Sequence, residues 1–295
     1  MREALASRLN KQHYEIVPVT LVSDCEQAGC PKDRNREIGE DHATKAGLHA
    51  VLELLAGHAL SEELKKNLPP GAEKIRKAEP DDLVVLSVSS HGYTSKEGMF
   101  YIVPSDSGHT EGHGLTEQLR QKWISSDELS AWLRDVDAGD LVMIVDTCHS
   151  AATVEEPGFK PGPMGSRGLG QLAYDKGMRI LAASQADDVA LESEKLKQGL
   201  LTYALVHDGL EAQQAVKAGT KEITLDSWLE YGSERVPTLY QQVLTGKVQT
   251  FAEGSKDVVI DQQLSGGTST LKKPASFQQP TLFNFQKNRG RLLLN

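Results

Sequence analysis

Two short apolar runs, each ending abruptly in polar residues, constrain the fold of this chain most strongly. Leu83 to Val88 (LVVLSV) leads into Ser-Ser-His-Gly, and Asp140 to Val145 (DLVMIV) leads into Asp-Thr-Cys-His-Ser. Apolar runs of this length are typical of strands that are buried on both faces of a parallel sheet. A third run, Met178 to Ala183 (MRILAA), ends in Ser-Gln-Ala-Asp-Asp. We therefore predict three strands of one sheet with polar groups at their carboxyl ends.

Segments with helical spacing separate these runs. The predicted helices cover residues 3–10, 44–57, 61–68, 126–135 (with Ser126 as the capping residue), 199–211 and 224–236. A β-branched stretch over 13–22 predicts one more strand, and residues 24–41, 154–175 and 246–280 have loop composition. Strands that alternate with helices predict a three-layer α/β/α sandwich with a mostly parallel sheet.

Composition narrows the classes of function. The 295 residues are enough for one large domain, and the net charge of −9 has the wrong sign for a nucleic-acid surface. We find no apolar run long enough for a membrane span and no signal-peptide pattern at the start. Three cysteines are a sparse, odd set, which favours a reducing compartment over a disulfide scaffold. We expect a cytoplasmic protein that binds neither nucleic acid nor membrane.

The strand ends bring together residues that could carry chemistry. Ligands of open α/β sheets bind outside the carboxyl ends of the strands, where this chain has His91, Cys148 and the pair Asp187 and Asp188. Cys148 could supply a thiolate nucleophile and His91 the imidazole that manages the proton. A turn at Gly92 would expose its N–H to a substrate oxyanion, as would the N–H of Cys148. The alternative is a buried structural cysteine beside a hydrogen-bonded histidine.

The motifs around these residues resemble those of the caspase-like cysteine peptidases, and most closely the bacterial orthocaspases and metacaspases. The resemblance covers most of residues 1–285 and is carried by Ser89-Ser90-His91-Gly92, Met99 to Asp106 (MFYIVPSD), Asp146-Thr147-Cys148-His149-Ser150 and Ser184 to Asp188 (SQADD). The Gln-Ala-Cys-x-Gly motif of true caspases is absent. The resemblance implies the caspase–haemoglobinase fold and a Cys148–His91 dyad.

The resemblance also implies a division of the single domain. Residues 1–153 correspond to a large subunit, 178–295 to a small subunit with an irregular C-terminal segment, and 154–177 to the loop between them, where relatives are often cut. Lys160, Arg167 and Lys176 are basic positions in this loop, and Arg167 is the preferred self-cleavage candidate. The alternative is an uncut, solvated loop.

Substrate preference follows from the positions that correspond to the family's acidic pocket. Asp146 and Asp188 would supply carboxylates, with Asp187 and Ser89 as further substrate-binding candidates. Carboxylates would bind a basic side chain and repel an acidic one, so the expected cleavage is after Arg or Lys. The alternatives are that Asp146 caps a turn and that the 187–188 pair begins a helix.

No metal site or cofactor is predicted. His109 and His113 have a spacing that a metal could use, but no third ligand accompanies them, and Cys25 and Cys30 do not have a zinc spacing. Relatives in the metacaspase branch often need calcium, although no calcium-loop motif occurs here.

The family begins with a central strand, whereas this chain begins with a helix. We expect a sheet that lacks this strand, and a chain that is part of a longer protein or a larger complex. The predicted function is a cysteine endopeptidase that acts on protein or peptide substrates. The alternative is a latent or non-catalytic caspase-like scaffold that recruits protein partners.

Overall fold

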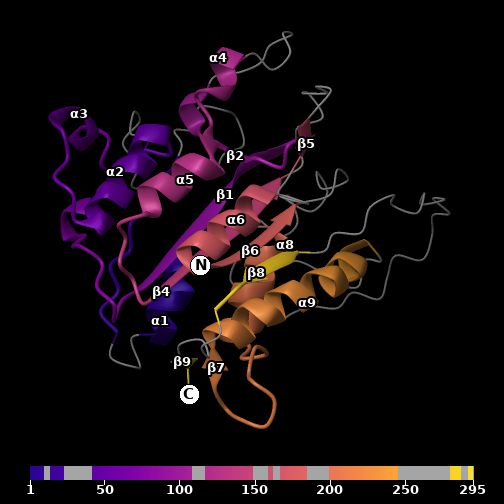
Figure 1. The fold of residues 1–295 in the computed structure, drawn as a ribbon. Coiled ribbons are helices and arrows are strands. Elements are labelled where there is room, and N and C mark those ends of the chain that lie inside the picture. The colour runs from indigo at the N-terminus through magenta and orange to yellow at the C-terminus, as the bar shows by residue number, and fades with distance from the viewer. Residues whose placement is uncertain are drawn as a thin grey trace, which may run out of the picture.

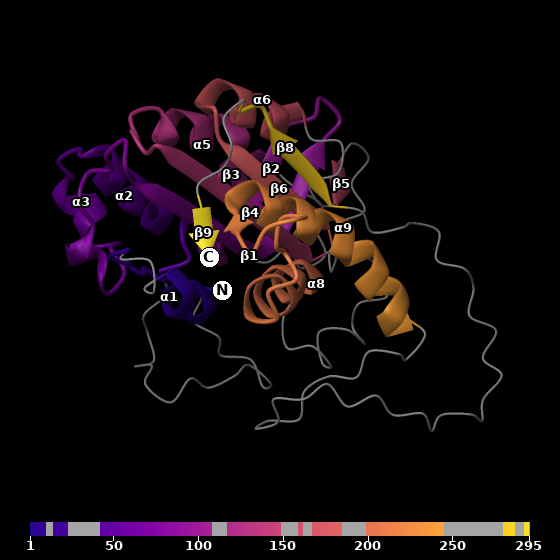
Figure 2. The ribbon, with the colours of Figure 1, turned by 90° about the horizontal axis from the view of Figure 1, so that it is seen from below.

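The computed structural model describes residues 1–9, 14–22, 42–107, 117–148, 159–161, 167–184, 199–244, 280–286 and 292–294. Within these ranges, one mixed sheet lies between two layers of helices (Figures 1 and 2). No helix in the described part combines the length and the apolar character needed to cross a membrane. The predicted α/β class with helices on both faces of a sheet is confirmed.

Three parallel strands form the centre of the main sheet. The whole sheet consists of β1 (Leu83–Ser95), β2 (Phe100–Val103), β3 (Ile124–Ser125), β4 (Asp140–Cys148), β5 (Phe159–Pro161), β6 (Arg179–Ser184) and β8 (Thr281–Asn284). β1, β4 and β6 run parallel, whereas β2, β5 and β8 are each antiparallel to the central strand they pair with. A separate small sheet pairs β7 (Ile223–Thr224) with β9 (Leu292–Leu294).

The helices form two groups on opposite sides of this sheet (Figure 2). One side carries α2 (Lys45–Ala56), α5 (Ser126–Leu133) and α6 (Arg167–Lys176). The other carries α1 (Arg2–Leu9), α8 (Leu200–Tyr203), the π-helix η5 (Ala204–Glu211) and α9 (Leu225–Leu244). Short helical turns complete the fold: α3 (Glu62–Lys65), η2 (Ala72–Lys74), η3 (Ser105–Ser107) and α4 (Glu117–Arg120).

Local sequence signals account for the helix ends. The Thr44 side chain accepts a hydrogen bond from the Gly47 N–H at 2.9 Å and begins α2, and Gly57 ends it with a left-handed φ of 80°. A capping box begins α5, in which Ser125 and Glu128 each bind the other's backbone N–H. The cap is thus Ser125, one residue before the predicted Ser126.

β4 is buried on both faces, as its apolar sequence predicts. Val142 and Ile144 pack into the core beneath α8 and α9, while Met143 and Val145 pack into the core beneath α2 and α5. These four side chains have essentially no exposed surface. Burial of this kind stabilises each side chain by about 1.5–3 kcal/mol, and it anchors β4 as the central strand.

β1 has an open edge over its first half. Residues 83–90 pair with β4 along one side, and none of the described strands pairs with their other side, because β2 joins β1 only from His91 onward. Leu83 to Leu86 are accordingly half-buried, although their sequence is as apolar as that of β4. The predicted strand over 13–22 does not form in its described part, 14–22.

Three predicted boundaries are wrong. β1 continues to Ser95, seven residues beyond the predicted Val88, because β2 and β5 pair with its last five residues, 91–95. The segment 154–177 is not all loop, since it contains β5 and the ten-residue helix α6, whose apolar side buries Leu169, Leu172 and Ala173. The C-terminal segment is not irregular throughout, because β8 and β9 lie in it.

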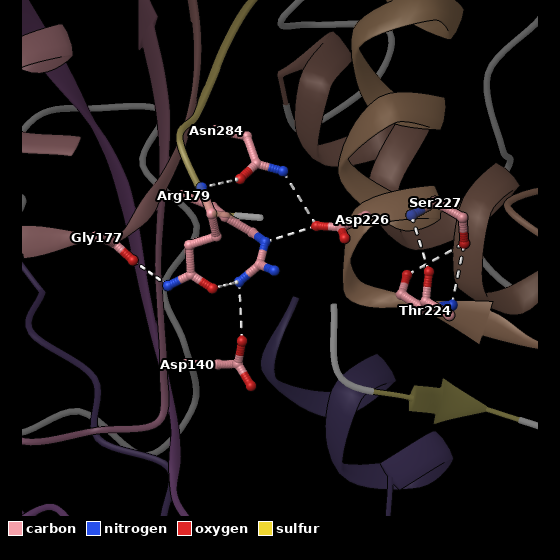
Figure 3. Close-up of polar contacts among 8 residues, drawn as sticks. Asp140, Gly177, Arg179, Thr224, Asp226, Ser227 and Asn284 are labelled. Atoms are coloured by element: carbon pink, nitrogen blue, oxygen red, sulfur yellow. Dashed lines mark hydrogen bonds and ion pairs between the residues drawn. The ribbon is translucent and has the colours of Figure 1, made fainter. Parts of the chain in front are cut away.

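A buried arginine joins the sheet to α9 and to the C-terminal segment (Figure 3). Arg179, the first residue of β6, is 0% exposed; its Nη1 donates to Asp140 Oδ1 at 2.8 Å and to Gln286 Oε1 at 2.9 Å, and its Nε donates to Asp226 Oδ1 at 2.6 Å. Asn284 donates to the same Asp226 oxygen. One guanidinium thus connects β4, β6, α9 and the residues after β8.

Replacing Arg179 by Met should lower the free energy of unfolding by about 3 kcal/mol, because the largely buried carboxylates of Asp140 and Asp226 lose the cation that they share. Urea denaturation followed by circular dichroism measures the change. Arg76→Met is the matched control: Arg76 binds Asp82 through two 2.8 Å hydrogen bonds but is 62% exposed, so its loss should change stability far less. Equal losses for the two variants would contradict the role assigned to Arg179.

Candidate active site

The parallel register of β1 and β4 places His91 and Cys148 side by side. Nine consecutive residues pair, from Leu83 with Asp140 to His91 with Cys148. Neighbouring strands lie about 4.8 Å apart, so the backbones of the two residues are adjacent. Cys148 is the last residue of β4, and the pair therefore lies at the carboxyl end of the central strand. The structure brings together the two residues that the sequence selected as a dyad.

The alternation of side chains along β1 decides on which face of the sheet His91 lies. Leu83 and Val85 pack with the core beneath α8 and α9. Ser89 and His91 continue the same odd-numbered face of β1, and both are exposed. Ser90 belongs to the opposite face, where its hydroxyl donates to the Val103 carbonyl at 2.6 Å. Ser89 and His91 thus lie on the side of the sheet that carries α8.

Asp146 lies on β4, two residues before Cys148 and paired with Ser89. The residue is 2% exposed. The Oδ2 atom accepts two hydrogen bonds from Thr202, one from the backbone N–H at 3.2 Å and one from the hydroxyl at 2.9 Å. The carboxylate therefore lies against the first turn of α8.

The contact with Asp146 caps α8. Gly199 is the N-cap residue of this helix and supplies no side-chain hydrogen bond of its own. Asp146 replaces that missing side chain, because an N-cap oxygen ordinarily accepts from the third helical N–H, which here belongs to Thr202. The structural alternative considered for Asp146 is thus observed. Whether the same carboxylate also binds substrate stays a prediction.

The predicted turn at Gly92 is wrong. Gly92 is buried within β1 and pairs with Ile102 of β2, so the chain passes straight through this position. The neighbouring Tyr93 stacks on Trp123 with ring centroids 4.8 Å apart, and both side chains are buried in a small cluster against Tyr101 and Val103 of β2. The run of aromatic and β-branched residues over Phe100–Val103 was the available signal for a strand here. The role of Gly92 as an oxyanion donor stays a prediction.

Arg167 does not lie in a flexible loop. It is the first residue of α6, and its side chain packs against Gly98 in the turn between β1 and β2. The next residue, Gly168, donates its N–H to the Gly98 carbonyl at 2.8 Å. Cleavage at Arg167 would require this end of the helix to unwind, because a peptidase binds extended chain. Lys176 ends α6, and burial lowers the pKa of its ammonium group.

Several predicted positions lie outside the described residues. They are Asp187, Asp188, His109, His113, Cys25 and Cys30. Among the residues that the structure describes, no group of three or more His, Cys, Asp or Glu side chains is arranged to hold a metal ion. An open hollow of about 500 Å³ lies instead on the outer side of α2 and α5, beside His49 and Trp132, and none of the predicted site residues lines it.

Sequence reasoning missed two residues of this site. Thr202 and Gly199 lie about fifty residues after Asp146 in the chain and carry no motif that would mark them. Only the packing of α8 on the sheet brings them to the carboxylate. Tyr203, the next residue, stacks on His207 at 4.7 Å, and burial raises the pKa of its hydroxyl to about 12; it is therefore uncharged at neutral pH.

No family model, no curated protein and no solved structure matches this chain. The resemblance to caspase-like peptidases therefore depends on the motifs and on the positions that the fold gives them.

Removing the Asp146 carboxylate should destabilise the fold, because α8 loses the cap of its first turn. We expect Asp146→Ala to lower the free energy of unfolding by about 1–2 kcal/mol, the usual loss for a helix cap, in urea denaturation. Glu230→Ala, on the exposed side of α9, is the control and should change stability little. An Asp146→Ala protein as stable as the wild type would show that the cap contributes nothing.

Proposed function

We propose that this chain is a caspase-like cysteine endopeptidase that cleaves after Arg or Lys. One observation carries the proposal: His91 and Cys148 occupy directly paired positions on neighbouring parallel strands, at the carboxyl end of β4. Active sites of open α/β sheets form at this end. The two strands are held together over nine paired residues, so the separation of the dyad is set by the sheet and not by a loop.

In the proposed reaction, the Cys148 thiolate attacks the carbonyl carbon of the scissile bond and forms a tetrahedral oxyanion. Backbone N–H groups at Cys148 and Gly92 are the candidate donors to that oxyanion. The intermediate collapses as the C–N bond breaks, and His91 gives its proton to the leaving amine. Water then hydrolyses the thioester, with His91 taking the proton of the water, and the free thiolate is restored.

The proposed preference for basic residues depends on Asp146, Asp187 and Asp188, with Ser89 as a polar neighbour. Ser89 is paired with Asp146 and exposed on the α8 side of β1. A carboxylate with little exposure to water interacts strongly with a guanidinium or ammonium group. It disfavours an acidic side chain for the same reason. The expected substrates are proteins or peptides with Arg or Lys before the cleaved bond.

A second candidate function is a latent caspase-like scaffold that binds protein partners. Two observations favour it: none of the described strands pairs with the outer edge of residues 83–90 in β1, the strand that carries His91, and Asp146 is 2% exposed and bonded to Thr202. In that case the dyad is present but the substrate pocket is closed. Reaction of Cys148 with an arginyl electrophile distinguishes the two, because only an assembled site is labelled.

The peptidase proposal is tested with paired fluorogenic peptides, one ending in Arg and one in Asp, with and without Ca²⁺. Wild-type protein should hydrolyse the Arg peptide alone. Cys148→Ala and His91→Ala should each lower kcat/KM by roughly a thousandfold or more, as removal of a catalytic group does. Cys30→Ala is the matched control and should retain activity. Absence of peptide hydrolysis by folded wild-type protein, or hydrolysis that survives Cys148→Ala, would contradict the proposal.

A further inference from the structure

The carboxylate of Asp146 is held in a cradle made by the first turn of α8. Two donors of a single residue, the N–H and the hydroxyl of Thr202, bind the same oxygen, Oδ2, at 3.2 and 2.9 Å. Two bonds from different directions fix the rotation of the carboxylate about its Cβ–Cγ bond. They thereby fix the direction in which its charge is presented.

Gly199 forms the second wall of the cradle. Its φ of −65° is open to every amino acid, so backbone conformation does not require glycine here. Space does: a Cβ at Gly199 would overlap both carboxylate oxygens of Asp146. The absence of a side chain lets the backbone of α8 approach the carboxylate and shield it from water.

The cradle contains more than the helix cap needs. A cap is complete when one side-chain oxygen accepts from the N–H of the third helical residue. The Thr202 hydroxyl adds a second bond to the same oxygen, from a side chain that is only half-buried and could otherwise donate to water. Asp146 lies on the strand of Cys148, two residues before it, so this second bond holds the carboxylate on the side of the site where Asp146 is proposed to act.

We infer that Thr202 is a positioning residue for substrate specificity: its hydroxyl and N–H orient the Asp146 carboxylate toward the basic side chain of the substrate, and Gly199 leaves the space for that orientation. This inference depends on the proposed peptidase function. Thr202 does not touch the reacting atoms, so its loss should alter selectivity and KM, while kcat changes little.

The test compares an Arg peptide with the same peptide carrying citrulline, which has the shape of arginine without the charge. Thr202→Val keeps the shape and the backbone N–H but removes the hydroxyl. It should lower the ratio of kcat/KM for Arg over citrulline roughly tenfold, the effect of losing one hydrogen bond to a charged group, mainly through KM. Thr202→Ser should restore the ratio.

Gly199→Ala tests the other wall independently. It should lower the same ratio at least as much, because the new methyl group displaces the carboxylate. Thermal unfolding of each variant checks that the fold persists. A Thr202→Val ratio equal to that of the wild type, in an enzyme that still cleaves the Arg peptide, would overturn the role of Thr202 alone. Absence of Cys148-dependent cleavage in the wild type would overturn the peptidase proposal and the positioning role with it.

Discussion

The parallel pairing of β1 with β4 is the interaction on which the rest of this structure depends. Its nine paired residues fix the register of the two strands, and a slip of one residue would turn every side chain of β1 to the other face of the sheet. Such a slip would expose Leu83 and Val85 to the wrong helix layer and separate His91 from Cys148. The packing of both cores and the geometry of the candidate dyad are therefore consequences of a single ladder.

The two ends of β4 are stabilised in different ways. At its first residue, Asp140 binds the buried Arg179, which also binds Asp226 at the start of α9. Near its last residue, Asp146 binds Thr202 at the start of α8. Each carboxylate of β4 thus connects the sheet to a helix of the same layer. The helices on this side are held by polar contacts at their ends as well as by the apolar core between them.

Much of the central architecture could be predicted from sequence, and the reasons are physical. The runs 83–88 and 140–145 are short and almost continuously apolar, which is typical of strands buried on both faces, so their composition alone indicates β1 and β4. β6 follows by the same argument. Helix α2 has a capping threonine and a terminal glycine, which are local signals. The dyad could be predicted because both residues directly follow such runs.

The wrong or missing predictions share a cause. The contacts that decide these parts of the structure join residues that are far apart in sequence. Gly92 was expected in a turn because Ser-Ser-His-Gly has turn composition, but pairing with Ile102 and the stacking of Tyr93 on Trp123 extend β1 through it. Arg167 was placed in a loop because Gly and Pro surround it, but packing of Leu169 and Leu172 against the sheet forms α6. The role of Thr202 cannot be predicted, because nothing near it in sequence indicates the carboxylate that it binds.

The open edge of β1 links these structural points to the choice between peptidase and scaffold. Exposed strand edges are usually protected by charged residues or proline, but Leu83 to Tyr93 contains neither. Among the described strands none pairs with this edge of residues 83–90, which belong to the strand that carries His91 and pair on their other side with the strand that carries Cys148. A strand added there would bury Leu83 to Leu86 on both sides and stiffen β1 up to His91. Occupation of this edge would therefore act on the strand that carries His91 without any new contact to the dyad itself.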